Sequence, residues 1–303
     1  FSSKYSRETT NYFEKMYINE KTVFEDLSFI LNFDNKPLAA FLGNIITKDN
    51  KIFIKNFDIP SLFVERKNGL TSKQKKKYYL YIDEILKIPF NFREFSGIEN
   101  SGKISYGIDY LLNRKLKITK NNFSRKIDLN NSEQFIKSNI RKCYHSLINW
   151  GLKELDLKIS DSSNIQEEDI MNLRDLHIQE AGRITRSKES WIAQYKQIKS
   201  SPSFMINGFL NNELVTSGIF VCNQNYCFYA VSASRRDLFD KPLFHALMWK
   251  AIIYAKERGM KIFETGCDYI ENSLSDKPSD KELNIAYFKS GFGGRLFQEI
   301  IVS

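Results

Sequence analysis

A lysine beside two aromatic residues, just before a glycine-rich turn, is the strongest candidate for an active site. The segment reads Asn284-Ile-Ala-Tyr-Phe-Lys-Ser-Gly-Phe-Gly-Gly-Arg295, and it leads into an apolar run, Phe297–Val302, typical of a closing strand. We expect Lys289 on the short helix before this strand, where it can stabilise an oxyanion together with glycine N–H groups. The alternative is an ordinary helix end, with Lys289 at the negative end of the dipole and Gly291 in the left-handed conformation.

Other charged and aromatic residues are candidates for the same site. Arg183 and Arg186 lie three residues apart and can clamp a phosphate or carboxylate, or form a solvated segment. Tyr229 is expected on a strand that faces the site, although an aromatic residue at that spacing also suits a core. Glu264, at the end of a predicted strand, can take the proton of an amine or serve as a structural carboxylate. His177 lies on a helix face with leucines, a pattern typical of a packed or capping histidine.

The composition is that of a globular protein with a basic surface. The 303 residues are 42% hydrophobic, enough for two domains, and 45 Lys+Arg against 36 Asp+Glu give a net charge of +9. Such a charge suits nucleotides, coenzyme phosphates, RNA or the headgroups of an anionic membrane. The scattered cysteines and histidines predict neither disulfides nor a metal site. No apolar stretch approaches the ~20 residues of a spanning helix, so we expect a cytoplasmic protein without a transmembrane segment.

The two halves of the chain have the same predicted order of elements. In the first half, turn residues separate strands at 27–32, 37–46 and 51–57, followed by a helix at 72–87 and a strand at 90–95. In the second half, strands at 204–210, 214–221 and 226–233 precede a helix with Pro242 in its first turn and a strand at 260–265. Further helices are expected at 8–18 and from Ser132 to about Gly151. The order predicts an α/β protein of two similar units, 1–125 and 126–303.

Three segments resemble the FemABX family, which is built from a duplicated GNAT (GCN5-related acyltransferase) fold. They are an arginine-bearing helix within 138–151, the helix–glycine–strand segment 254–266, and Phe288-Lys-Ser-Gly-Phe-Gly-Gly294. Together they cover most of 120–303, whereas 20–115 matches only in layout. The resemblance implies two tandem GNAT-like units, each a mixed, largely antiparallel sheet flanked by helices.

The same resemblance implies an enzyme that transfers an acyl or aminoacyl group to an amine with no covalent enzyme intermediate. Lys289 then stabilises the tetrahedral intermediate, and Phe288 contributes its backbone. Tyr287 is similar in position to the general-acid tyrosine of single-unit GNAT enzymes. The acceptor implied by the family is an amino sugar, free or nucleotide-linked, in the biosynthesis of cell-envelope polysaccharide.

The donor implied is an acyl-CoA such as acetyl-CoA, or an aminoacyl-tRNA. GNAT enzymes bind the coenzyme pyrophosphate on a glycine-containing loop before a helix. The corresponding segment here, 234–242, has no glycine, although Arg235 and Arg236 can supply charge. Two alternatives stay open: an aminoacyl-tRNA-dependent transferase of the peptidoglycan-bridge type, and a non-catalytic basic binding protein on the same fold.

Overall fold

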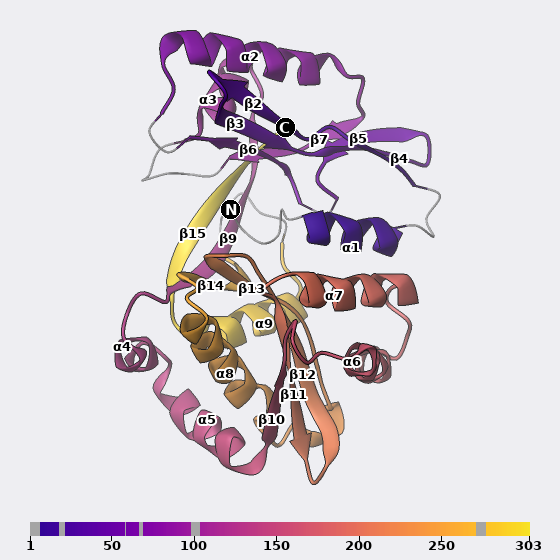
Figure 1. Cartoon of the computed structure of the whole chain (residues 1–303), viewed down its shortest axis with the longest axis vertical. Coiled ribbons are helices and arrows are strands. Elements are labelled where there is room, and N and C mark those ends of the chain that lie inside the picture. Colours follow the sequence, from indigo (N-terminus) through magenta and orange to yellow (C-terminus); the bar gives the residue numbers. More distant parts are fainter. Residues whose placement is uncertain (1–6, 18–21, 58, 67–68, 98–103, 271–276) are drawn as a thin grey trace. The chain divides into compact units, whose positions relative to one another are not determined.

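The computed structural model describes residues 7–17, 22–57, 59–66, 69–97, 104–270 and 277–303 (Figure 1). The chain divides into two compact units. The C-terminal unit comprises residues up to Met16, 124–268 and 278–297, and the N-terminal unit comprises 17–123, 269–277 and 298–303. The division therefore falls within two strands, β9 (Ile118–Asp128) and β15 (Arg295–Val302), and the first helix, α1 (Arg7–Tyr17), belongs largely to the C-terminal unit.

The C-terminal unit is built on a sheet with the strand order β10-β11-β12-β13-β14. These strands are β10 (Asp156–Ser160), β11 (Phe204–Leu210), β12 (Glu213–Cys222), β13 (Tyr226–Ser234) and β14 (Ile262–Asp268). All neighbours are antiparallel except β13 and β14, which are parallel. Asn211 and Asn212 both adopt positive φ in the β11–β12 turn, as a two-residue hairpin requires.

Alternating residues of this sheet pack into two separate cores. Phe204, Phe220 and Cys222 face α5 (Lys142–Glu154) and α8 (Leu243–Glu257), whereas Met205 and Ile219 face α6 (Glu167–Ala181) and α7 (Lys188–Ser200). Figure 1 shows the two pairs of helices on opposite sides of the strands. Because successive side chains of a strand point to opposite faces, each strand supplies apolar residues to both cores.

The N-terminal unit repeats the order in a smaller form. Its main strands are β2 (Phe29–Phe33), β3 (Lys36–Leu42), β6 (Ser61–Glu65) and β8 (Phe95–Gly97), and β6 and β8 are parallel. Two helices, α2 (Ser72–Lys87) and α3 (Tyr106–Asn113), complete its core. A second sheet contains β1 (Val23–Asp26), β4 (Asn44–Lys48), β5 (Lys51–Lys55) and β7 (Phe92–Arg93).

Several predicted elements are divided in the structure. The predicted strand 37–46 breaks at Gly43, because β3 pairs with β2 and β6 while β4 pairs with β1 and β5. The predicted strand 90–95 divides in the same way into β7 and β8. The predicted helix from Ser132 is two helices, α4 (Glu133–Ser138) and α5, since the Arg141 N–H donates to the Gly291 carbonyl at 2.8 Å. In the described part of the chain, no helix is long and apolar enough to cross a membrane.

Candidate active site

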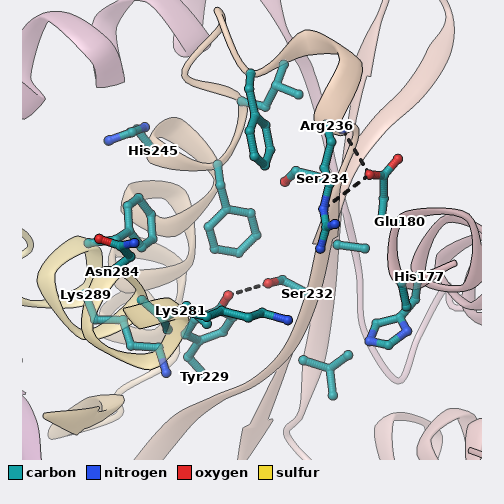
Figure 2. Close-up of a pocket in the computed structure, with 18 of the residues that line it drawn as sticks. His177, Glu180, Tyr229, Ser232, Ser234, Arg236, His245, Lys281, Asn284 and Lys289 are labelled. Atoms are coloured by element: carbon teal, nitrogen blue, oxygen red, sulfur yellow. Dashed lines mark hydrogen bonds and ion pairs between the residues drawn. The ribbon is translucent and has the colours of Figure 1, made fainter. Parts of the chain in front are cut away.

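A pocket lies in the C-terminal unit beside the part of β13 that no longer pairs with its parallel neighbour, β14. The β13–β14 pairing ends at Phe228 and Glu264, although both strands continue. The β12–β13 register also shifts between Ile219 and Phe220, so that Ala230 is an extra, bulged residue. The pocket has a volume of about 1300 Å³ (Figure 2). Its lining comes from α6 and the segment after it, from β13 and the loop after it, from the start of α8 and from α9 (Asp280–Ser290).

Lys289 reaches into this pocket from the last turn of α9. Its Nζ lies 5.2 Å from the centroid of the Tyr229 ring, within the range of a cation–π contact. The lysine side chain passes over Gly266 of β14, where a Cβ would come within 2.7 Å of Nζ. Because φ of Gly266 is +107°, this position favours glycine on two counts. The structure therefore brings together Lys289 and Tyr229, two of the predicted site residues.

The side of α9 that faces the pocket follows helical spacing. Its residues are Lys281, Asn284, Ile285, Phe288 and Lys289. Sequence reasoning missed Lys281 and Asn284, although both lie on the same helical face as Phe288.

Tyr287 lies on a different face of α9 and does not line the pocket. Its side chain is 66% exposed, and the Arg141 guanidinium lies 3.9 Å from the ring centroid. The structure therefore places Tyr287, the expected general acid, outside the pocket lining, because a shift of one residue on a helix turns a side chain by about 100°.

The C-terminal end of α9 is held by α5. Arg141 Nη2 donates to the Tyr287 carbonyl and to Ser290 Oγ, both at 3.2 Å, and Tyr144 Oη donates to the Phe288 carbonyl at 3.2 Å. A cation here is favourable because the helix dipole is negative at this end. Arg141 and Tyr144 therefore fix the turn that carries Lys289.

The glycines after α9 serve packing. Gly291 is helical, with φ of −65°, and a Cβ there would overlap the Tyr144 ring. The left-handed positions are Gly293 and Gly294, with φ of +79° and +90°, which corrects the expectation for Gly291. The N–H groups of Gly291 and Gly293 donate to the Phe288 and Ser290 carbonyls. These two N–H groups are therefore engaged within the turn, and Lys289 is the remaining candidate among the three for the predicted oxyanion contact.

Tyr229 is a neutral phenol in the lining of the pocket. Its Oη is hydrogen-bonded to Ser232 Oγ, and its ring packs against Phe220 and Phe244 at centroid distances of 5.8 and 5.4 Å. Burial raises the pKa of Tyr229 to about 12. The phenol is therefore protonated at neutral pH.

The charged groups of the pocket are mainly basic. Glu180 of α6 accepts from the Arg236 backbone N–H at 3.0 Å and lies 3.8 Å from the Arg236 Nε. The other lining cations are Arg183, Lys241, Lys281 and Lys289. Arg183 and Arg236 thus line the pocket as predicted candidates, and the excess of positive charge favours an anionic ligand.

Two histidines also line the pocket. His177 of α6 is hydrogen-bonded through Nδ1 to Thr185 Oγ1 at 3.4 Å, and burial, Arg186 and Lys281 lower its pKa. His245 of α8 lies among aromatic rings, and burial lowers its pKa to about 4. Sequence reasoning assigned His177 to packing because its helix face carries leucines; its contact with the pocket depends on tertiary structure.

Three predicted site residues are used structurally. Glu264, the expected proton acceptor for the amine, is 2% exposed, accepts a hydrogen bond from the Tyr226 hydroxyl and does not line the pocket. Arg186 lies 3.4 Å from the Trp191 ring centroid, and its guanidinium donates to Tyr12 Oη and Gln194 Oε1. It therefore does not form a clamp with Arg183.

Arg235 is the third residue outside the pocket lining. Its guanidinium pairs with Glu213 at 2.8 Å and with Asp237 at 2.5 Å. Backbone N–H groups of the loop before α8 are also satisfied: that of Arg235 donates to the Val215 carbonyl of β12, that of Lys241 to Leu238 and that of Leu243 to Lys241, each at 2.9 Å. This loop therefore offers few donors to a coenzyme pyrophosphate, in contrast to a glycine-rich phosphate loop.

Comparison with known proteins places the fold. No profile of a known protein family and no curated protein matches the sequence. Among solved structures, FemX superposes with a TM-score of 0.68 at 11% identity, over 98% of this chain and 91% of that chain. The chain has a FemX-like fold. L-PGS from Bacillus licheniformis superposes with a TM-score of 0.57 at 10% identity, over 100% of this chain and 92% of that chain.

A further neighbour is the C-terminal domain of a putative lysylphosphatidylglycerol synthetase from Agrobacterium fabrum, with a TM-score of 0.57 at 9% identity, covering 98% of this chain and 92% of that domain. The predicted architecture of two tandem GNAT-like units is confirmed by the FemX-like fold. At these identities the likeness concerns the fold alone.

Proposed function

We propose that this chain is an acyltransferase that moves an acyl or aminoacyl group directly to an amine. The observation that carries the proposal is Lys289, whose ammonium enters a basic pocket over the Tyr229 ring. A cation at that place can stabilise the negative charge that develops on a carbonyl oxygen when an amine attacks it. The FemX-like fold supports this class of reaction by analogy.

The proposed reaction passes through a tetrahedral intermediate on the donor. Lys289 contacts the oxyanion, and the ring of Phe288 lines the pocket beside it. Tyr229 keeps its proton at neutral pH because of its raised pKa, so its hydroxyl can donate a hydrogen bond to the leaving oxygen or sulfur. The phenol of Tyr229 thus replaces that of Tyr287 as the candidate acid.

For the donor, we favour an aminoacyl-tRNA over a coenzyme A thioester. Several N–H groups of the loop before α8 are already hydrogen-bonded, and the Arg235 guanidinium is paired with two carboxylates. The net charge of +9 suits a polyanion. The loop therefore favours a transferase of the peptidoglycan-bridge type, with an aminoacyl-tRNA as donor. The other candidate donor is acyl-CoA, tested as acetyl-CoA.

For the acceptor, we infer an amino sugar that carries phosphate, such as a nucleotide-linked precursor of a cell-envelope polysaccharide. The amine would meet the acyl carbonyl near Lys289, and Arg183, Arg236 and Lys281 supply positive charge for the phosphates. Contact with an anionic membrane surface, and action in the cytoplasm, are further parts of this proposal.

The test is transfer of a radiolabelled acyl group from acetyl-CoA or from charged tRNA to nucleotide-linked amino sugars. Lys289→Met should lower turnover by roughly 10²–10³-fold, the usual cost of removing one oxyanion donor. The matched control is Lys153→Met, because Lys153 is exposed on α5 outside the pocket. A folded Lys289→Met protein with full turnover would contradict the assignment.

The binding-protein alternative is separated by the same reagents. Ligands that raise the melting temperature of the wild-type protein, with no product formed from any donor, would favour a non-catalytic binder.

A further inference from the structure

Direct transfer to an amine requires a group that removes a proton from the attacking nitrogen. We propose that His177 is this general base, and that its Nε2 takes the proton of the acceptor amine as the nitrogen attacks the acyl carbonyl. The inference rests on the proposed acyltransferase function and adds a catalytic residue to it. It is carried by the position of His177 in the pocket that also contains Lys289.

The other candidate bases of the pocket are less suitable. Glu180 already accepts from the Arg236 N–H and faces its guanidinium. The His245 ring is enclosed by Tyr144 and Phe288, at centroid distances of 4.5 and 5.1 Å. Burial lowers the pKa of His245 to about 4, which makes it too weak a base near neutral pH. The remaining charged groups are lysines and arginines, which carry a proton already.

The ring of His177 is oriented by two neighbours. Thr185 Oγ1 lies 3.4 Å from Nδ1, and the Trp191 ring meets the imidazole edge to face at a centroid distance of 5.5 Å. When the threonine hydroxyl accepts the Nδ1 proton, the lone pair lies on Nε2. The arrangement is that of a base held in one tautomer by a hydroxyl on its far side.

The charges around His177 favour the neutral ring. From α9, Lys281 extends its ammonium toward the imidazole (Figure 2). Arg186, in the segment after α6, adds a second positive charge, and together with burial these charges lower the pKa of His177. Arg183 also lines the pocket, Glu180 is paired with Arg236, and Tyr229 of β13 is neutral. His177 is therefore unprotonated at neutral pH and able to accept a proton.

The step balances without a further reactant. The carbon–nitrogen bond forms as the amine nitrogen loses one proton to Nε2 of His177. The bond from the acyl carbon to the leaving oxygen or sulfur then breaks, and the leaving atom takes up one proton from the Tyr229 hydroxyl, which regains a proton from water. The imidazolium returns its proton to solvent, so that one proton moves from acceptor to leaving group.

The experiment compares kcat/KM from pH 5 to pH 9 for the wild-type protein and for His177→Gln. A general base contributes about 10²–10⁴-fold to the rate. The kcat/KM of the variant should therefore fall at least about 100-fold near pH 7.5, and its pH profile should lose the part of the acidic limb that belongs to His177. The control is His145→Gln, which makes the same substitution in a histidine outside the pocket lining and should keep both rate and profile.

Chemical rescue separates a base from a packing residue. Added imidazole should restore part of the turnover of His177→Ala, since it replaces the missing group, whereas a structural defect would not respond. Thr185→Val provides a second variant that retains the imidazole; it should lower kcat by about tenfold through the loss of orientation.

The outcomes distinguish this inference from the function on which it rests. A wild-type protein that transfers no acyl group overturns the proposed function and this inference together. An active wild type with a folded His177→Gln protein of unchanged rate and pH profile overturns the inference alone. Failure of imidazole to rescue His177→Ala, with Thr185→Val unaffected, also overturns it.

Discussion

The two units share an order of elements, but they use the helix after their parallel strands differently. In the N-terminal unit this helix is α3, and it buries Ile108 and Leu111 in the core. In the C-terminal unit the corresponding helix is α9, whose buried residue is Ala286 and whose pocket side includes Lys281 and Lys289. One copy of the fold therefore fills the space beside its strands, and the other keeps it open.

Glycines show how each choice is made. In the N-terminal unit, a Cβ at Gly107 would come within 2.8 Å of the Phe63 ring, and one at Gly97 would overlap Ser105. These glycines allow α3 to approach the strands. Gly266 of the C-terminal unit instead makes room for the side chain of Lys289. We infer that the N-terminal unit is structural and that the chemistry belongs to the C-terminal unit.

Gly266→Ala tests whether Lys289 depends on the open space beside β14, and it should have the largest effect. The added Cβ competes with Lys289 for space, and the positive φ strains any other residue. We expect turnover to fall by on the order of 10²-fold, as for removal of an oxyanion donor, with a loss of stability of about 1–3 kcal/mol. Steady-state kinetics and urea unfolding measure the two effects. Unchanged turnover would show that Lys289 need not lie over Gly266.

Arg141→Met tests whether the end of α9 positions Lys289. The variant removes the hydrogen bonds to the Tyr287 carbonyl and to Ser290, so the last turn of α9 should loosen. We expect kcat to fall by about tenfold with KM little changed, since misplacement of a contact group costs rate. Arg141→Lys, which keeps the charge at the helix end, should recover part of the loss. Equal losses in both variants would argue against a role for the charge.

Gly107→Ala tests the N-terminal unit, in which α3 fills the space beside the strands. The methyl group meets the Phe63 ring, and overpacking of a core typically costs about 1–3 kcal/mol. The tryptophans, Trp150, Trp191 and Trp249, all lie in the C-terminal unit. Tryptophan fluorescence therefore does not report on the N-terminal unit, and far-UV circular dichroism should be used to detect its destabilisation. The kcat at saturating substrate should stay unchanged. A large fall in kcat would mean that the N-terminal unit takes part in the chemistry.

The smallest expected effect is on the free energy of unfolding, whose dependence on pH should have opposite signs in the two units. The pKa of His245 is lowered to about 4, so its contribution is fully favourable above the unfolded value of about 6.5 and is lost as pH falls toward 4. Glu65, which accepts from Tyr78 and Gly107, has a raised pKa because of burial. Its contribution is favourable below the unfolded value of about 4.3 and is lost as pH rises through the folded value.

Tryptophan fluorescence during urea unfolding reports the C-terminal unit, so it should show the loss of stability between about pH 6.5 and 4. His245→Gln should flatten that dependence, and Glu65→Gln should leave it unchanged. A dependence as steep in His245→Gln as in the wild type would assign the effect to another group.

The parts of the fold that sequence reasoning found depend on local signals. Asp34 and Asn35, like Asn211 and Asn212, adopt the positive φ of a hairpin turn, and such turns are readable from residue type. The break at Gly43 was missed because it depends on which sheet each half of the strand joins, which is a tertiary choice. The helix α3 and the strand β10 were also missed.

The site was found in part for the same reason. Lys289 was predicted from a motif confined to a few neighbouring residues, and it does enter the pocket. Tyr287 and Glu264 were assigned by their nearness in sequence or at a strand end, but the side-chain directions of a helix and a strand turn them elsewhere. His177 required knowledge of which helix covers β13, and periodicity does not supply it.

The exchange of segments between the units has a consequence for synthesis. The N-terminal unit includes 298–303, where Val302 pairs with Phe95 and Ser303 exchanges backbone hydrogen bonds with Lys117. The C-terminal unit includes α1, whose Tyr12 accepts from Arg186. Many chains fold one domain at a time as they leave the ribosome. Here neither unit has all its parts until residues near 300 emerge, so a protein cut short after Gly294 would lack part of the unit made first.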